Sequence, residues 1–221
     1  RVTMTLRHME PLSDADKQSL REFADRHHIE WFPQSAGPNT VSRFWPESAD
    51  DQLQYFLPDE TGDICIAFYP GDFTQVNADI NRKMIQQAMQ LLDLQNDDNV
   101  LDLFCGLGNF TLPMARRCAS VTGVEGSEDM VARAGANAVR NGLANTRFFS
   151  ADLFTNFDST RWATAGYSKL LLDPPRSGAI ALVSRIRDLL PEVIVYVSCN
   201  PATLARDAAE LANQGYQLTH A

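Results

Sequence analysis

The sequence predicts an α/β fold. Residues 71–221 are expected to form a Rossmann-like αβα sandwich with a mostly parallel sheet, preceded by a small α+β unit over residues 1–70. Two observations lead to this prediction. From about residue 72, short β-branched and leucine-rich runs alternate with segments of helical apolar spacing, which is typical of a doubly wound sheet. Before that point, short strand-like runs are separated by turns rich in proline, glycine and acidic residues.

The first part of the chain begins with a strand and a helix. Val2, Met4 and Leu6 alternate with polar neighbours, which predicts a strand with one buried face. Ser13 is placed to cap a helix whose apolar residues share one side. Further short strands are expected near residues 29–32, 40–45, 53–57 and 64–69.

The second part opens with a helix predicted over 78–92, where Ile85, Ala88 and Leu92 lie on one face. Helices of about 10 to 16 residues are expected between the strands that follow. Five apolar runs are predicted to form those strands, at 99–104, 120–124, 146–150, 169–172 and 193–197.

Composition limits the class of protein. The 221 residues are 44% hydrophobic and 21% charged, which is ordinary for a globular protein, and no apolar run approaches the roughly 20 residues that cross a bilayer. The four cysteines lie far apart, without the spacing of metal ligands. We therefore expect a cytoplasmic protein with no metal site and no membrane partner, and we expect it to be a monomer.

The formal net charge of −9 argues against a nucleic-acid partner, because proteins that bind polyanions usually carry a basic patch. Net charge does not exclude a local patch. The arginines that could form one are Arg176, Arg185, Arg187 and Arg206. They form either such a patch or a solvated helix face, and if RNA binds, segments outside this chain are expected to help.

A glycine-containing loop follows the first strand of the second part, at residues 102–109. Gly106 and Gly108 let the backbone turn tightly and approach a ligand. A dinucleotide site would need a third glycine where Thr111 stands, so the loop favours a nucleoside without a pyrophosphate. Glu125 ends the second strand, 19 residues after Gly106, where an acid can bind ribose hydroxyls.

Further reactive side chains follow the later strands. Asp152 and Asp173 end the third and fourth strands, so their carboxylates are expected at the same edge of the sheet. Cys199 follows the fifth strand, just before a helix that Pro201 opens. Its thiol is either exposed to a substrate near a helix N-terminus, which favours a nucleophilic thiolate, or a small buried apolar group.

The loop and strand-end residues together resemble class I S-adenosylmethionine-dependent methyltransferases. Four stretches sharpen the resemblance to the RNA uracil-C5 methyltransferase family, and within it to enzymes that modify 23S ribosomal RNA. These stretches are FTQVN at 73–77, DLFCGLGN at 102–109, DPPRSG at 173–178 and SCNP at 198–201. The match covers about residue 71 to the C-terminus, with weaker similarity before it.

The resemblance implies S-adenosylmethionine as cofactor and RNA, not DNA, as partner. It implies that Cys199 is the nucleophile, that Phe73 stacks on an extruded base, and that Asp173 also contacts the base edge. The residues implied to contact the cofactor, or the pocket between it and the base, are Gln75, Phe104, Asn109, Glu125, Asp152 and Asp173.

The family also has parts that this sequence does not match. Its ribosomal RNA enzymes carry an upstream RNA-binding (TRAM) barrel and a [4Fe-4S] cluster held by four cysteines, and the cysteines here do not occupy those positions. Its proton-abstracting glutamate lies past the last strands. Glu192 and Glu210 are unconvincing substitutes. We therefore expect a fragment, truncated at both ends, that binds cofactor but turns over poorly.

Three other functions fit the sequence less well. A tRNA uracil-C5 methyltransferase has similar but shorter motif agreement. An N-methyltransferase would share the Asp-Pro-Pro segment at 173–175 but would not need Cys199. A non-catalytic RNA-binding module would keep the fold without the reaction.

Overall fold

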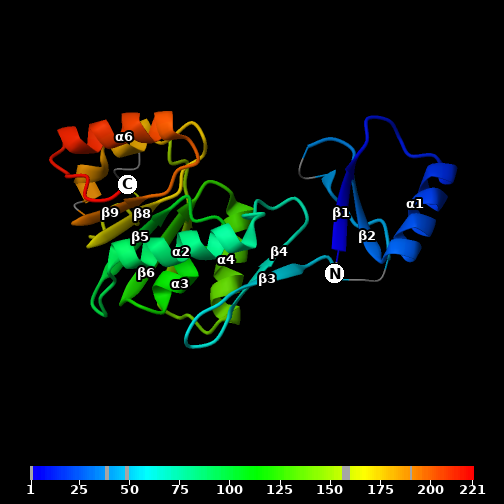
Figure 1. Cartoon of the computed structure of the whole chain (residues 1–221), viewed down its shortest axis with the longest axis horizontal. Coiled ribbons are helices and arrows are strands. Elements are labelled where there is room, and N and C mark those ends of the chain that lie inside the picture. The colour runs from blue at the N-terminus through cyan, green and yellow to red at the C-terminus, as the bar shows by residue number, and fades with distance from the viewer. Residues whose placement is uncertain (1, 38–39, 48–49, 156–159, 190) are drawn as a thin grey trace. The chain divides into compact units, whose positions relative to one another are not determined.

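The computed structural model describes residues 2–37, 40–47, 50–155, 160–189 and 191–221. It divides into two compact units (Figure 1). The first comprises Arg1–Tyr55 and Ala67–Thr74, and the second comprises Phe56–Ile66 and Gln75–Ala221. The expected division of the chain at residues 70 and 71 stays a prediction.

The first unit is built on a parallel strand pair. β1 (Val2–Arg7) and β2 (Ile29–Gln34) are joined by α1 (Asp14–His27). Ser13 caps α1 as predicted, because its hydroxyl accepts from Asp16 N and the Asp16 carboxylate accepts from Ser13 N.

A hairpin of β3 (Leu53–Leu57) and β4 (Ile64–Phe68) contributes to both units. Within the second unit, Asp59 at its turn pairs with Arg117 at 2.6 Å and with Arg116 at 3.0 Å. Burial disfavours the Asp59 carboxylate, but hydrogen bonds from Arg117, Thr61 and Arg116 outweigh it and lower its pKa to about 2. The turn of the hairpin is thus anchored by charge.

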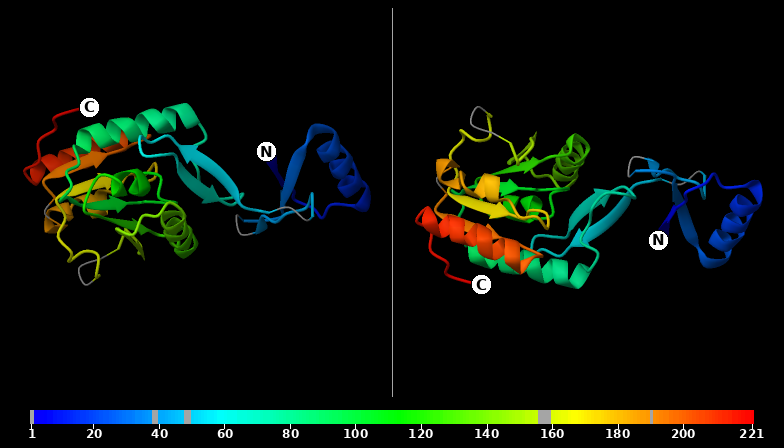
Figure 2. Two further views of the ribbon diagram at one scale, coloured as in Figure 1. Left: turned by 90° about the horizontal axis from the view of Figure 1, so that it is seen from below. Right: turned by 90° about the horizontal axis from the view of Figure 1, so that it is seen from above.

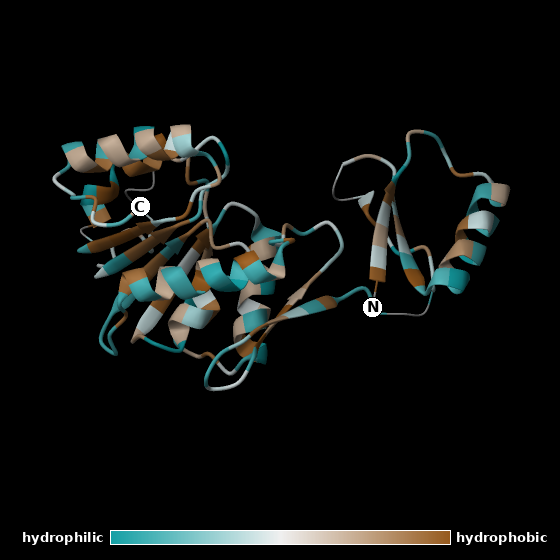
Figure 3. Cartoon of the chain, viewed as in Figure 1, coloured by the Kyte–Doolittle hydropathy of each residue, from teal (hydrophilic) through white to brown (hydrophobic). Residues whose placement is uncertain are grey.

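The second unit contains a parallel sheet of five strands in the order β7-β6-β5-β8-β9, which confirms the predicted α/β architecture. Figure 3 shows brown segments along these strands, and buried leucine or valine lies on β5, β6, β8 and β9. The strands are β5 (Asn99–Leu103), β6 (Ser120–Glu125), β7 (Thr146–Ser150), β8 (Lys169–Leu172) and β9 (Val193–Tyr196).

Helices cover both faces of this sheet, and α6 lies above it in Figure 1. Two further views show the same layers (Figure 2). On one face Leu101 and Leu170 pack in a buried cluster with residues from α5, η2 and α6. The other face meets α2, α3 and α4, as the bond from Thr111 to Asp102 shows. The helices are α2 (Ala78–Leu92), α3 (Thr111–Ala115), α4 (Glu128–Arg140), α5 (Ile180–Val183), η2 (Ile186–Leu189) and α6 (Pro201–Asn213).

The expected connecting helices were wrong in three places. Between β7 and β8 the described residues, 151–155 and 160–168, contain no helix. α3 has only five residues and α5 only four. The physical reason is that the irregular loops 104–110 and 173–179 take up much of the chain between these strands. Both loops follow the carboxyl ends of strands, where they are available to form a site.

Gly123 on β6 tests how closely this strand packs against Phe148 of β7 and Cys105. A Cβ there would lie 2.8 Å from a Phe148 ring carbon and 2.9 Å from Cys105 Sγ. We expect Gly123→Ala to lower the free energy of unfolding by about 1–3 kcal/mol, because a buried contact of this kind forces neighbours to move. Urea unfolding measures the change. Gly135→Ala on α4 is the matched control, since a Cβ there meets nothing within 4 Å. An equal midpoint for both variants would contradict the packing argument.

Candidate active site

The candidate site lies at the carboxyl edge of the parallel sheet. The chain runs outward from β5 through β6 to β7 and then returns to β8 on the other side of β5. Ligands of open α/β sheets bind outside the strand ends at such a reversal. The sequence motifs follow the strands on either side of it: the glycine loop after β5, Glu125 at the end of β6, Asp173 after β8 and Cys199 after β9.

The glycine loop after β5 is held by the acid at the end of β6. Gly106 N donates to Glu125 Oε2 and Ser127 N donates to Glu125 Oε1, each at 3.2 Å. Gly106 and Gly108 have φ values of 55° and 94°, which glycine adopts without strain. Phe104 also has a positive φ, 66°, and such strain in a non-glycine residue often marks a functional loop.

Asp102 lies beneath this loop and is fully buried. Thr111 Oγ1 donates to its Oδ2 at 2.5 Å, while Oδ1 has no hydrogen-bond partner among the described residues. Burial raises the pKa of Asp102 to about 8. The nearby charges of Asp173 and Glu125 also raise this pKa, whereas the hydrogen bond from Thr111 lowers it. The carboxyl is therefore neutral through most of the neutral pH range. Sequence reasoning placed Asp102 at the strand end and missed its burial.

The protonated state of Asp102 predicts a pH dependence of stability. Its pKa of about 8 in the native state exceeds the unfolded value of 3.8, so between these values the native state binds more protons. The free energy of unfolding is therefore expected to fall as pH rises from about 4 to 8. Asp102→Asn should flatten this slope in urea titrations at several pH values. Because Asp173 contributes in the same direction up to about pH 6, the diagnostic difference is the one between pH 6 and 8. Equal slopes there in both proteins would contradict the assignment.

Asp173 and Asp152 differ in their surroundings. Asp173 follows β8, its N–H donates to Leu103 O at 3.3 Å, and burial raises its pKa to about 6. Asp152 is exposed, and its Oδ1 accepts from Phe154 N at 2.9 Å, which makes a local turn. The Phe154 ring lies 5.8 Å from that of Phe104, so an aromatic pair joins the loops after β5 and β7.

The remaining predicted cofactor residues lie near the start of α2. Asn109 exchanges two amide hydrogen bonds with buried Asn81 of α2, at 2.8 and 2.9 Å. Gln75 is half-buried, two residues before the helix cap Asn77. Phe73 is 71% exposed and belongs to the first unit. Asn81 was not predicted, although an asparagine on the apolar side of a helix is a signal that could have been followed.

Cys199 is exposed just beyond the end of β9. Its neighbours are ordered: Asn200 N donates to Ser198 Oγ at 3.1 Å, and Asn200 Oδ1 caps α6 by accepting from Ala202 N at 3.1 Å. The Asn200 amide also donates to Arg176 O at 3.1 Å. The structure thus joins the SCNP and DPPRSG loops, which the sequence predicted at one sheet edge.

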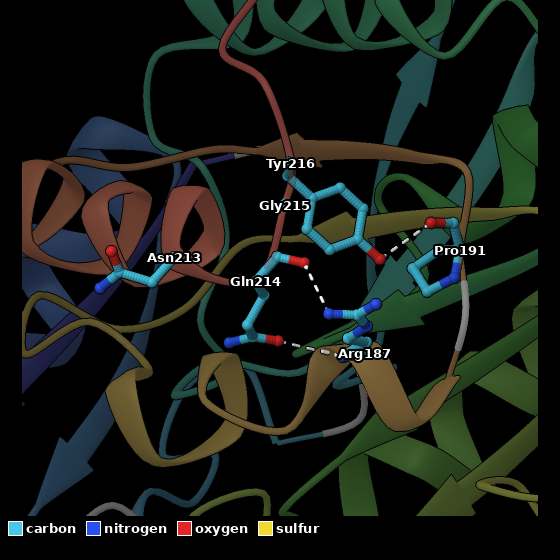
Figure 4. Close-up of a pocket in the computed structure, with 6 residues that line it drawn as sticks. All are labelled: Arg187, Pro191, Asn213, Gln214, Gly215 and Tyr216. Carbon is cyan, nitrogen blue, oxygen red and sulfur yellow. Dashed lines mark hydrogen bonds between the residues drawn. The ribbon is translucent and has the colours of Figure 1, made fainter.

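A separate hollow lies at the other end of β9 (Figure 4). There Tyr216 Oη donates to Pro191 O at 2.9 Å, and Arg187 bonds to Gln214 through both backbone and side chain. These polar groups therefore form hydrogen bonds with one another across the hollow. Elsewhere in the described part of the chain, no three His, Cys, Asp or Glu side chains gather to hold a metal ion. None of its helices is long and apolar enough to span a membrane.

The comparisons with known proteins decide the family. The model of the tRNA (uracil-5-)-methyltransferase family matches residues 47–220. The chain belongs to this family. The resemblance found in the motifs is confirmed at that level.

Relatives of known name are about half identical to the chain. The 23S rRNA (uracil(1939)-C(5))-methyltransferase RlmD of Legionella pneumophila is 49% identical over 98% of this chain and 49% of its own length. The enzyme of the same name from Xanthomonas campestris is 51% identical over the whole chain, again 49% of its own length. The chain therefore spans about half the length of these uracil-C5 methyltransferases.

A solved structure shares the fold at lower identity. The Pyrococcus abyssi tRNA (uracil-54, C5)-methyltransferase, solved with S-adenosyl-L-homocysteine, superposes with a TM-score of 0.71 and 25% identity. The match covers 95% of this chain and 49% of that one. It confirms the Rossmann-like fold of the second unit within this methyltransferase family.

Proposed function

We propose that this chain is the methyltransferase half of an S-adenosylmethionine-dependent enzyme that methylates C5 of a uracil in 23S ribosomal RNA, in the cytoplasm. The observation that carries the proposal is the exposed Cys199 in a loop tied to the Asp173 loop, at the same sheet edge as the glycine loop and Glu125. The relatives that are half identical to the chain are named for this reaction, which favours ribosomal RNA over tRNA. The free state of all four cysteines fits a reducing compartment.

The residues at the strand ends fit S-adenosylmethionine. The loop turns at Gly106 and Gly108 with φ values that favour glycine. The Glu125 carboxylate can exchange its bond to Gly106 N for ribose hydroxyls. When bound, the cofactor supplies an electrophilic methyl group on a sulfonium. The residues proposed to hold it, or to line the pocket shared with the base, are Gln75, Phe104, Asn109, Glu125, Asp152 and Asp173.

The role proposed for Cys199 is to make C5 of uracil nucleophilic. Its thiolate adds to C6, and the electron pair of the C5–C6 bond moves toward O4 as an enolate. C5 would then form its bond to the methyl group while the bond from that methyl to the sulfonium sulfur breaks, with S-adenosylhomocysteine as the leaving group. A base must next remove the C5 proton, after which the C5–C6 double bond re-forms and the C6–S bond breaks, releasing the thiolate. Asp173 is proposed to hydrogen-bond the uracil edge, and Phe73 to stack on the extruded base.

The proposal is tested by the product. The complete protein is incubated with S-adenosylmethionine carrying a labelled methyl group and with transcripts of 23S rRNA or tRNA, and the RNA is digested to nucleosides. We expect the label in 5-methyluridine from the ribosomal transcript. Label in 5-methyluridine from tRNA alone would favour the tRNA enzyme, and label on a nitrogen would favour the N-methyltransferase.

Glu125 offers a test of the cofactor site. We expect Glu125→Gln to weaken S-adenosylmethionine binding by about 10- to 100-fold, because hydrogen bonds to a charged acceptor contribute about 1.5–3 kcal/mol. Isothermal titration calorimetry measures the dissociation constant. Glu128→Gln, an exposed acid three residues later at the start of α4, is the control. If both variants bind as the unmodified protein does, Glu125 does not hold the ribose.

A further inference from the structure

The carboxylate of Asp207 is a buried charge that the proposed reaction does not use. It lies in α6 and is 0% exposed. Its Oδ2 accepts from Ala179 N at 2.7 Å and from Tyr196 Oη at 2.6 Å, and its Oδ1 pairs with Arg206 at 2.7 Å. Burial disfavours the charge, but these three partners outweigh it and lower the pKa of Asp207. Burial of a charged carboxylate is unfavourable by itself, and here both oxygens of Asp207 have hydrogen-bond partners that offset it.

Asp207 belongs to a set of side chains that we call the α6 clamp, comprising Asn200, Thr203, Arg206 and Asp207. The clamp holds the backbone of the loop after β8. Asn200 and Thr203 donate to Arg176 O at 3.1 and 3.3 Å. Arg206 donates to Ser177 O at 3.0 Å, and Asp207 accepts from Ala179 N. Positions 203, 206 and 207 share one face of the helix because of their spacing.

The clamp connects the two loops that carry the proposed chemistry. The clamped loop begins at Asp173 after β8, and Cys199 lies between β9 and α6. β8 and β9 are paired neighbours, with Leu172 opposite Tyr196. Strand pairing fixes these loops at their origins, and the clamp fixes them again beyond the strand ends. Directional hydrogen bonds of this kind restrict the positions of the reacting side chains more than apolar packing does.

We propose that Asp207 is a positioning residue that holds the loop of Asp173 against the loop of Cys199, so that both meet the same uracil. This inference rests on the proposed function of Cys199. Asp207 itself is buried and touches no substrate. Its loss is expected to slow addition of the thiolate to C6 while leaving cofactor affinity nearly unchanged, because five of the six residues proposed for the cofactor and its shared pocket, all except Asp173, lie outside the clamped loop.

The test follows formation of a covalent adduct between the complete protein and RNA containing 5-fluorouridine, in the presence of S-adenosylmethionine. Asp207→Asn removes the charge, and Tyr196→Phe removes a single donor to Oδ2. Asp188→Asn, an acid whose side chain is 64% exposed, is the control. We expect adduct formation to slow about tenfold or more with Asp207→Asn and a few-fold with Tyr196→Phe. The dissociation constant of the cofactor should stay within about twofold.

Rates equal to that of the Asp188→Asn control in both variants would overturn the inference. So would a parallel loss of cofactor affinity, which a general loss of structure would cause. If Asp207→Asn does not fold, Tyr196→Phe decides by the same two readouts. Failure of the unmodified protein to form the adduct, with cofactor bound, would contradict the proposed function itself and the inference with it.

Discussion

Replacing Cys199 with alanine is expected to abolish methyl transfer, lowering its rate by at least about 10⁴-fold, the scale on which nucleophile removal acts in other covalent catalysts. Without the thiolate, C5 of uracil remains too weak a nucleophile to accept the methyl group. Because Cys199 is exposed, the substitution leaves no cavity in the core. The measurement is the rate of labelled methyl incorporation into RNA by the complete protein.

Two controls accompany Cys199→Ala. Its dissociation constant for S-adenosylmethionine should match that of the unmodified protein, which excludes loss of the cofactor site as the cause. Cys65→Ala replaces a half-buried cysteine on the β4 strand and should keep most of the activity. Substantial methyl transfer by Cys199→Ala would contradict the covalent mechanism and favour the N-methyltransferase alternative.

Gly178→Ala is expected to lower the unfolding free energy of the second unit by about 3 kcal/mol or more, from backbone strain and overpacking together, and to abolish most adduct formation. A Cβ at this position would lie 2.6 Å from both Asp207 Oδ2 and Arg206 Nη2, and its φ of 73° already strains a side chain. The Arg206 tip can move, but Asp207 Oδ2 is fixed by Ala179 and Tyr196. Urea unfolding and 5-fluorouridine trapping measure the two effects.

Gly166→Ala separates the two causes of instability in Gly178→Ala, which are close contact with neighbouring atoms and strain of the backbone at positive φ. Its φ is 72°, and a Cβ there meets nothing within 4 Å. Gly166→Ala should therefore cost only the backbone strain, about 1–2 kcal/mol, without slowing adduct formation. If the two alanine variants lose the same stability, close contact with the α6 clamp does not constrain the loop.

β5 and β8 of the second unit could be predicted from sequence because their residues are largely buried on both faces. Apolar runs such as 170–172 predict a buried strand, and β7 and β8 have the predicted bounds. α3 and α5 were expected to be longer, because periodicity does not reveal how much chain a functional loop consumes. Their shortness depends on loops whose conformation is set by partners far along the chain.

Which residues belong to the candidate site could be predicted from sequence better than how they are arranged. Strand ends placed Glu125, Asp173 and Cys199 at one edge, as observed. The pairing of Asn109 with Asn81 was beyond sequence reasoning, because it joins residues on separate elements. The full burial of Asp207 could not be predicted from sequence either, since a charged residue on a helix is usually solvated.

The most direct test of the account is covalent trapping at Cys199. The complete protein and its Cys199→Ser variant are incubated with S-adenosylmethionine and 23S rRNA fragments containing 5-fluorouridine, whose C5 fluorine cannot leave as a proton does. Denaturing electrophoresis detects the adduct, and mass spectrometry of its peptides locates the bond. We predict an adduct on the peptide carrying Cys199 that is absent from the serine variant. An adduct on another residue, or none although the cofactor is bound, would contradict the account.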